Sequence, residues 1–157
     1  SNKQKFMNLI VPTVAQTSRN TCWHASAQMI WYYWQGIHHR QGPMNTLSAN
    51  YKSDAGVRPE QFVILAGKTG LKKVNHDFRN YTTGMIGWLL SSYGPLWCAG
   101  YWYGVGHIIV LTGVDHNSVY FNDPDGGIRK KEGVAWFNNK LSKTVPGCIM
   151  HKDPHAY

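Results

Sequence analysis

The pattern of apolar residues changes at Pro95. Before Pro95, apolar side chains recur at helical spacing, which predicts helices over residues 22–35, from 59 to 67 or 70, and over 83–92, with a polar loop over 36–54. After it, short runs separated by Gly, Asn, Asp and Pro predict strands over residues 96–103, 107–114, 119–123, 128–132 and 147–152, and a short helix over 134–141. This order predicts the α+β class, with an N-terminal helical lobe and an antiparallel β-sheet.

The chain has 157 residues, of which 43% are hydrophobic, enough to bury the core of one domain and to form a cleft. We therefore expect a single domain over residues 1–157. Residues 1–8 are expected to be flexible or to derive from cloning. No apolar run approaches the roughly 20 residues that a membrane-spanning helix needs, so we expect a soluble protein.

Basic residues outnumber acidic ones by 16 to 8, which gives a formal net charge of +8. Such a charge favours acidic partners. The basic residues are scattered, however, and no recognition helix, RNA-binding aromatic motif or zinc finger accompanies them, so nucleic-acid binding is not expected. The chain has three cysteines, too few for a disulfide-dense scaffold, and the His38-His39 pair lacks further ligands nearby. We expect neither a metal nor a cofactor.

Cys22 is the strongest candidate for a chemical role. It follows Thr21, a residue type that caps helices, so it is expected on the first helical turn. The N–H groups at the start of a helix carry partial positive charge, which stabilises a thiolate, the nucleophilic form of cysteine. Six positions upstream, the Gln16 amide could join the Cys22 backbone N–H as a donor to an oxyanion. This pattern favours acyl transfer with Cys22 as the nucleophile.

His107 is the candidate general base, because it opens an apolar strand directly after Gly104-Val105-Gly106. An acid–base partner needs to be adjacent to the nucleophile in space and not in sequence. At the mouth of a strand, the ring would be held rigidly while the glycines border a cleft. We expect His107 to meet Cys22 across that cleft.

A third group should orient the imidazole, and Asp123 and Asp125 are the candidates. A hairpin centred on Asp115 would place His107 opposite Asp123, whereas a centre at His116-Asn117 would favour Asp125. We prefer Asp123, because it ends the predicted strand, where the backbone is better fixed.

Gln16, Cys22-Trp23, the late Gly106-His107 strand and Asp123-Pro124 together resemble the catalytic skeleton of papain-like cysteine peptidases. The most similar kinds are bacterial: peptidase domains of double-glycine bacteriocin exporters, avirulence effector proteases of plant pathogens, and papain-like toxin domains. The resemblance implies a helical lobe that carries the cysteine and a sheet that carries the histidine and the acid. The chain departs from plant papains before Cys22 and in using aspartate instead of asparagine, which disfavours a lysosomal, disulfide-bonded enzyme.

The expected substrate is a protein or peptide, bound near Trp23, Trp102, Tyr103 and Gly106. Among these, the aromatic residues beside Gly104 could form the wall of a subsite. The resemblance also implies a bacterial effector or interbacterial toxin, secreted or delivered into the cytoplasm of a target cell by a secretion system. It further implies an immunity or inhibitor protein that covers the cleft.

Two other functions use the same residues. A glutamine deamidase or transglutaminase-like acyltransferase employs the same thiol, imidazole and carboxylate. A binding domain built on an inactive protease scaffold would keep the fold without the chemistry. Cleavage of a target chain distinguishes the protease from both.

Overall fold

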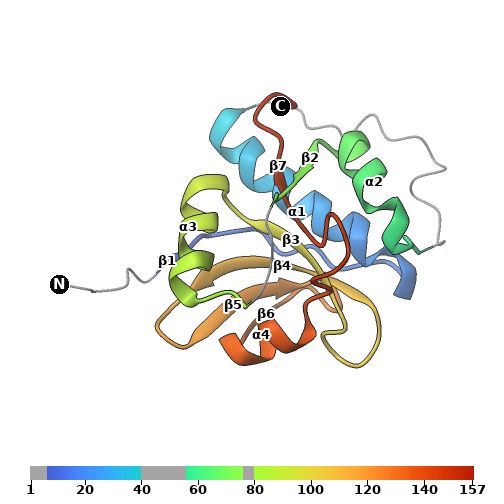
Figure 1. Cartoon of the computed structure of the whole chain (residues 1–157). Coiled ribbons are helices and arrows are strands. Elements are labelled where there is room, and N and C mark those ends of the chain that lie inside the picture. Colours follow the sequence, from blue (N-terminus) through green and yellow to red (C-terminus); the bar gives the residue numbers. More distant parts are fainter. Residues whose placement is uncertain (1–6, 40–55, 76–79) are drawn as a thin grey trace.

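The computed structural model describes residues 7–39, 56–75 and 80–157 (Figure 1). Its helices and single-turn 3-10 helices are η1 (Arg19–Thr21), α1 (Cys22–His38), η4 (Pro59–Gln61), α2 (Phe62–Thr69), α3 (Thr83–Tyr93) and α4 (Val134–Lys140). Its strands are β1 (Met7–Asn8), β2 (Leu71–Lys73), β3 (Leu96–Gly100), β4 (His107–Val114), β5 (Ser118–Asp123), β6 (Ile128–Gly133) and β7 (Ile149–Lys152). The predicted α+β class is confirmed.

The strands form one antiparallel sheet in the order β2-β7-β3-β4-β5-β6, with β1 paired to the end of β4. In β1, Met7 and Asn8, the last two residues of the segment expected to be flexible or to derive from cloning, pair with Val114 and Gly113. Residues 1–6 lie outside the described ranges. The backbones approach so closely that a Cβ on Gly113 would lie 2.4 Å from the Met7 carbonyl oxygen, which only glycine avoids.

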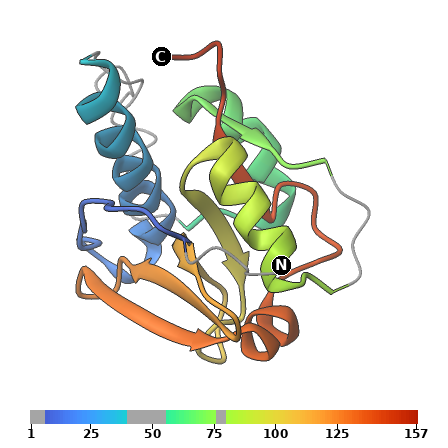
Figure 2. The ribbon, with the colours of Figure 1, turned by 90° about the vertical axis from the view of Figure 1, so that its left-hand side faces the viewer.

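Helices lie on both sides of the sheet (Figures 1 and 2). Helix α1 packs on β3, β4 and β7, while α4 packs on β5 and β6. Trp97 of β3 joins the helical lobe to the sheet: its indole N–H donates to the Trp23 carbonyl oxygen at 3.2 Å, and its ring meets Phe62 of α2 edge to face. These contacts fix the start of α1 against the central strands.

Helix α1 is longer than predicted, because it continues through Gly36 to His38. Its last turn is held by the stacking of His38 on Trp34, an i,i+4 pair with ring centroids 5.3 Å apart. His39, with a positive φ of 55°, ends the helix. The remainder of the predicted loop lies largely outside the described residues.

The other elements follow the predictions with smaller changes. The helix predicted from Pro59 begins as a 3-10 turn and ends at Gly70, which adopts the left-handed conformation at φ 70°. Helix α3 starts at Thr83, with the Thr82 hydroxyl accepting the Met85 N–H at 3.1 Å. Two short strands, β1 and β2, were not predicted, because two or three residues show no alternation.

Candidate active site

A cavity of about 270 Å³ lies where the start of α1 meets the start of β4. The residues of its lining that bear on function are Cys22, His107, Arg19, Trp23, Phe62 and Tyr101. The predicted meeting of the thiol and the imidazole across a cleft is therefore present, and the side chain of Cys22 is hydrogen-bonded to the His107 ring. The two groups come from elements separated in sequence by the rest of the helical lobe.

Cys22 is the first residue of α1, as predicted, but Thr21 does not cap the helix in the expected way. The Thr21 hydroxyl accepts the backbone N–H groups of Thr17 at 3.2 Å and Ser18 at 3.1 Å, and donates to the Ser18 carbonyl oxygen. It makes no hydrogen bond to the first turn of α1. The hydroxyl thus stabilises the turn before Cys22 and does not cap the first turn of α1.

His107 is held between Cys22 and Asp123. Its Nε2 atom lies 2.6 Å from Oδ1 of Asp123, which leaves Nδ1 as the ring nitrogen for the sulfur of Cys22. Burial lowers the pKa of His107, but the hydrogen bonds with Asp123 and Cys22 outweigh it and raise the pKa to about 9. The imidazolium form is therefore favoured at neutral pH.

Asp123 is 1% exposed and accepts hydrogen bonds from three groups. Oδ1 accepts from His107 and from the backbone N–H of Asp125 at 2.9 Å, and Oδ2 accepts from Lys130 at 2.8 Å. Burial raises the pKa of Asp123, but the hydrogen bonds from His107, Lys130 and Asp125 outweigh this effect and hold the pKa below its usual range. Asp123, and not Asp125, is thus the carboxylate that contacts His107.

The predicted hairpin register that led to Asp123 is wrong. Val114 pairs with Val119, so the hairpin is centred at His116-Asn117, and an irregularity between Leu111 and Gly113 then shifts the pairing by one residue. Val110 pairs with Asn122, so Asp123 lies on the same face as His107 and diagonal to it. A diagonal pair is within reach of long side chains, which explains the contact.

Gln16 lies near the site but does not line the cavity. Its backbone N–H donates to the carbonyl oxygen of Pro124 at 2.7 Å, directly beside Asp123. Upstream, the buried Asn122 amide donates to the Val11 carbonyl oxygen at 3.0 Å. The end of β5 thus fixes both the carboxylate and the segment that carries Gln16. Oε1 of Gln16 is buried and has no hydrogen-bond partner among the described residues.

Two of the four predicted substrate-binding residues, Trp23 and Gly106, line the cavity. Trp102 does not, and the prediction is wrong for it: it is 1% exposed, its indole N–H donates to the Cys98 carbonyl oxygen at 3.2 Å, and its ring stacks on Phe137.

Strand β3 ends at Gly100 instead of residue 103, and the Trp102 ring lies so close to it that a Cβ on Gly100 would be 2.7 Å away. Tyr103 packs on Trp136 and lies outside the cavity lining. Tyr101, 60% exposed, lines the cavity instead, and sequence reasoning did not single it out.

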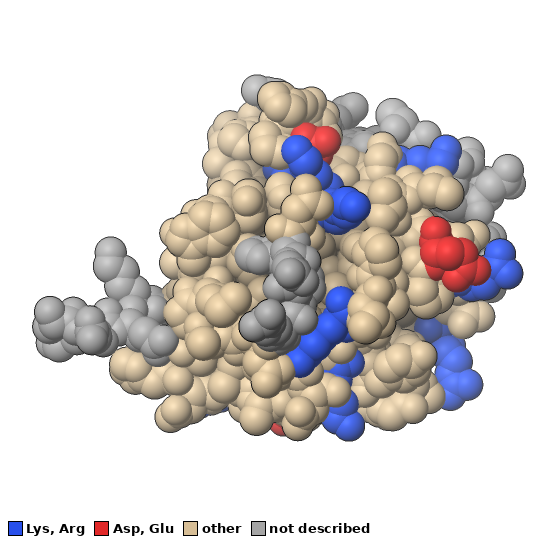
Figure 3. Space-filling model, in the orientation of Figure 1, with Lys and Arg blue, Asp and Glu red and all other residues tan. Residues whose placement is uncertain are grey.

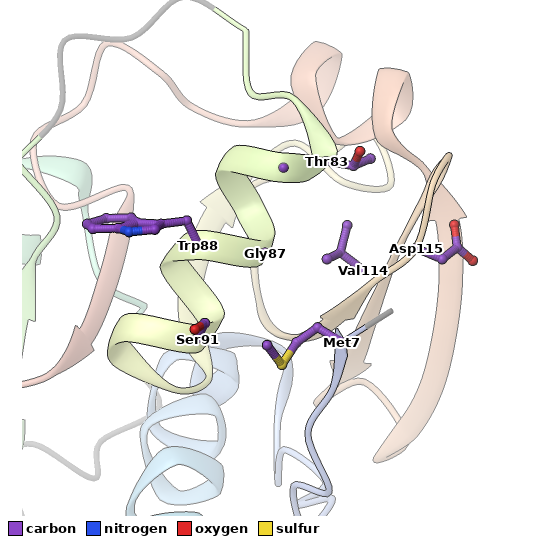
Figure 4. Close-up of a pocket in the computed structure, with 8 residues that line it drawn as sticks. Met7, Thr83, Gly87, Trp88, Ser91, Val114 and Asp115 are labelled. Carbon is purple, nitrogen blue, oxygen red and sulfur yellow. The ribbon is translucent and has the colours of Figure 1, made fainter. Parts of the chain in front are cut away.

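A second cavity of about 270 Å³ lies between α3, β1 and the end of β4 (Figure 4). Its lining is mainly apolar and includes Met7, Gly87, Trp88 and Val114. The Asp115 carboxylate points away from Met7 and Ser91 in Figure 4, and accepts the Tyr120 hydroxyl at 2.6 Å. Among the described residues, its lining contains neither a cysteine nor a histidine.

Comparison with known proteins identifies the family of the chain. A sequence model of the family described as papain-like cysteine protease AvrRpt2 matches residues 5–142, a range that includes Cys22, His107 and Asp123. The chain belongs to this family. It is therefore a papain-like cysteine peptidase.

The fold of the peptidase is also similar to a solved structure of a double-glycine-motif protease from an AMS/PCAT transporter, which is in complex with the leader peptide. The TM-score is 0.58 at 18% sequence identity, and the match covers 94% of this chain and 96% of that one. At this identity the likeness establishes the fold alone.

Within the described ranges of the peptidase, no helix has the length and apolar character to cross a membrane. Lys and Arg side chains lie at several separate places on the face shown in Figure 3.

Proposed function

We propose that the chain hydrolyses peptide bonds of a protein substrate through a triad of Cys22, His107 and Asp123. The observation that supports this most directly is the hydrogen-bonded series from Asp123 through His107 to Cys22 at one end of a cavity. Membership in a papain-like protease family supports the same reaction. The order of the three groups matches nucleophile, base and orienting group.

In the proposed reaction, the sulfur of Cys22 attacks the substrate carbonyl carbon and forms a tetrahedral intermediate. His107, protonated while it pairs with the thiolate, gives its proton to the leaving amine as the C–N bond breaks. Water, deprotonated by the now neutral imidazole, then attacks the thioester; the acid is released and the sulfur leaves as the thiolate, which restores its pair with the imidazolium. Asp123 keeps Nε2 of His107 occupied throughout, so Nδ1 remains directed to the reacting atoms.

We further propose that the Gln16 side-chain amide joins the Cys22 backbone N–H in stabilising the oxyanion. In support, Gln16 is anchored to the end of β5, and its amide has a buried oxygen with no partner. A half-turn about the last side-chain torsion would place the amide N–H groups at that position. Replacing Gln16 by alanine is expected to lower kcat by about 10²- to 10³-fold, because one oxyanion donor is lost. Kinetics with Gln16→Ala and Gln16→Glu test this; a fully active alanine variant contradicts it.

A peptide segment is the proposed ligand of the cleft. The structural neighbour binds a leader peptide, and the cavity here combines apolar surfaces, such as Phe62 and Tyr101, with the charged Arg19. The family name supports, as a further proposal, an effector or toxin delivered into a target cell. An immunity protein that covers the cleft, where Tyr101 is exposed, would restrain such an enzyme in the producing cell.

A comparison of peptide termini tests the proposed function. Cells that express the wild-type chain should contain new protein termini that are absent from cells expressing Cys22→Ala. Equal expression of the two chains, and a matched variant of the buried Cys148, Cys148→Ala, serve as controls. Intact targets that gain about one dalton would instead indicate glutamine deamidation. A cellular effect that survives in Cys22→Ala would indicate a binding domain.

A further inference from the structure

Lys130 lies on β6 and contacts Asp123 from the side of β5 opposite to His107 on β4. Its Nζ atom lies 2.8 Å from Oδ2 of Asp123 and 4.3 Å from the centre of the Tyr103 ring. Its side chain is one-third exposed, whereas that of Asp123 is 1% exposed. Lys130 is therefore a cation held between a buried carboxylate and an aromatic ring, not a solvated surface lysine.

The sheet register explains this placement. On β5 and β6, Phe121 pairs with Lys130 and Asp123 pairs with Ile128, so Lys130 and Asp123 share a face and are diagonal neighbours. His107 stands in the same diagonal relation to Asp123 on β4. The carboxylate at the end of the middle strand thus receives one donor from each neighbouring strand.

We propose that Lys130 is a positioning residue of the peptidase: it holds the Asp123 carboxylate in the orientation that keeps its Oδ1 atom on His107. This inference depends on the proposed triad. Oδ1 already accepts from His107 and the Asp125 N–H, so Lys130 is the described partner of Oδ2. Without it, the carboxylate loses the contact that opposes rotation about its last torsion. Tyr103 limits the positions of the ammonium by its ring.

The charge of Lys130 also affects how Asp123 responds to acid. The charged and titratable groups that face Asp123 are His107 from β4, Lys130 from β6 and Tyr103 from the β3–β4 loop, with Cys22 acting through His107. Lys130 lowers the pKa of Asp123, so removing it raises that pKa. Asp123 then becomes protonated at a higher pH, and the His107 imidazolium loses its anionic partner earlier during acidification.

The test compares Lys130→Met with Lys131→Met, which removes a neighbouring and more exposed lysine whose nearest carboxylate is Asp115 at 3.7 Å. Iodoacetamide is the probe, and the alkylation rate of Cys22 is measured by mass spectrometry from pH 4 to 9. For Lys130→Met we expect the acidic limb of the profile to move to higher pH. Below neutral pH, the alkylation rate of Cys22 in Lys130→Met should be about three- to tenfold lower than in the wild type, because the variant loses one charge-assisted hydrogen bond that solvent partly screens. Lys130→Arg should restore the profile, and Lys131→Met should match the wild type.

A direct titration separates this inference from the proposed function. The Asp123 side-chain carboxyl is followed by carbon NMR in the wild type and in Lys130→Met, and its midpoint should be higher in the variant. Unchanged midpoints together with superimposable alkylation profiles would overturn the role of Lys130. If the midpoint moves while peptide cleavage persists in Cys22→Ala, the role of Lys130 in placing Asp123 stands, and the proposed function fails. Tyr103→Ala, which removes the ring beside the ammonium, should shift the profile partway.

Discussion

Replacing His107 by alanine is expected to lower kcat/KM for peptide cleavage by about 10⁴-fold or more. The ring is the hydrogen-bond partner of Cys22, and no other histidine among the described residues lines the cavity. The variant therefore lacks both the partner of the thiolate and the donor to the leaving amine. His116→Ala, which removes an exposed histidine from the hairpin that follows β4, is the matched control and should retain activity. The rates are measured on a peptide that spans a cleavage site found by the comparison of termini.

The pH dependence provides a second check on His107. Its pKa of about 9 lies above the ordinary 6.5, so the pairing with Asp123 and Cys22 stabilises the folded protein fully below pH 6.5 and is lost as the pH rises through 9. Alkylation of Cys22 in the wild type should therefore remain fast at mildly acidic pH, where a thiol without such a partner is unreactive. Slow alkylation in that range, equal to that of Cys98 and Cys148, would contradict the pairing.

The elements that carry the site could be predicted because their signals are local. The cysteine at a helix start and the histidine after Gly106 depend on neighbours in sequence, and β4 begins and ends where predicted. The end of α1 was missed because Gly36 is a local stop signal, while the stacking of His38 on Trp34 continues the helix past it.

The choice of Asp123 shows where sequence reasoning reaches its limit. Asp123 contacts His107, but it was chosen from a register that the structure does not have. An irregularity of one residue in β4 cannot be read from alternation, and the true contact is diagonal. Lys130 was passed over for the same reason, because its importance depends on which face of β6 meets Asp123. Trp102 was placed at the cleft because the residue type alone does not distinguish an aromatic side chain that lines a cleft from one that is buried below it.

Replacing Asp123 by asparagine is expected to lower kcat by up to about 10⁴-fold, with a smaller effect on KM. Asparagine keeps the shape of the side chain but removes its charge, and its amide can donate to Nε2 of His107, which favours the wrong tautomer. The change also removes the carboxylate that pairs with Lys130, so the ammonium then faces a neutral amide.

Asp125→Asn is the matched control, because Asp125 is exposed and contributes to the site through its backbone N–H, which the substitution retains. It should leave kcat within about twofold of the wild type, as is usual for a surface substitution. If Asp125→Asn is inactive and Asp123→Asn is active, then Asp125, and not Asp123, orients the imidazole, and the role proposed for Asp123 is contradicted. Equal and large losses in both variants, with unchanged melting temperatures, would mean that the exposed carboxylate also takes part once a substrate is bound.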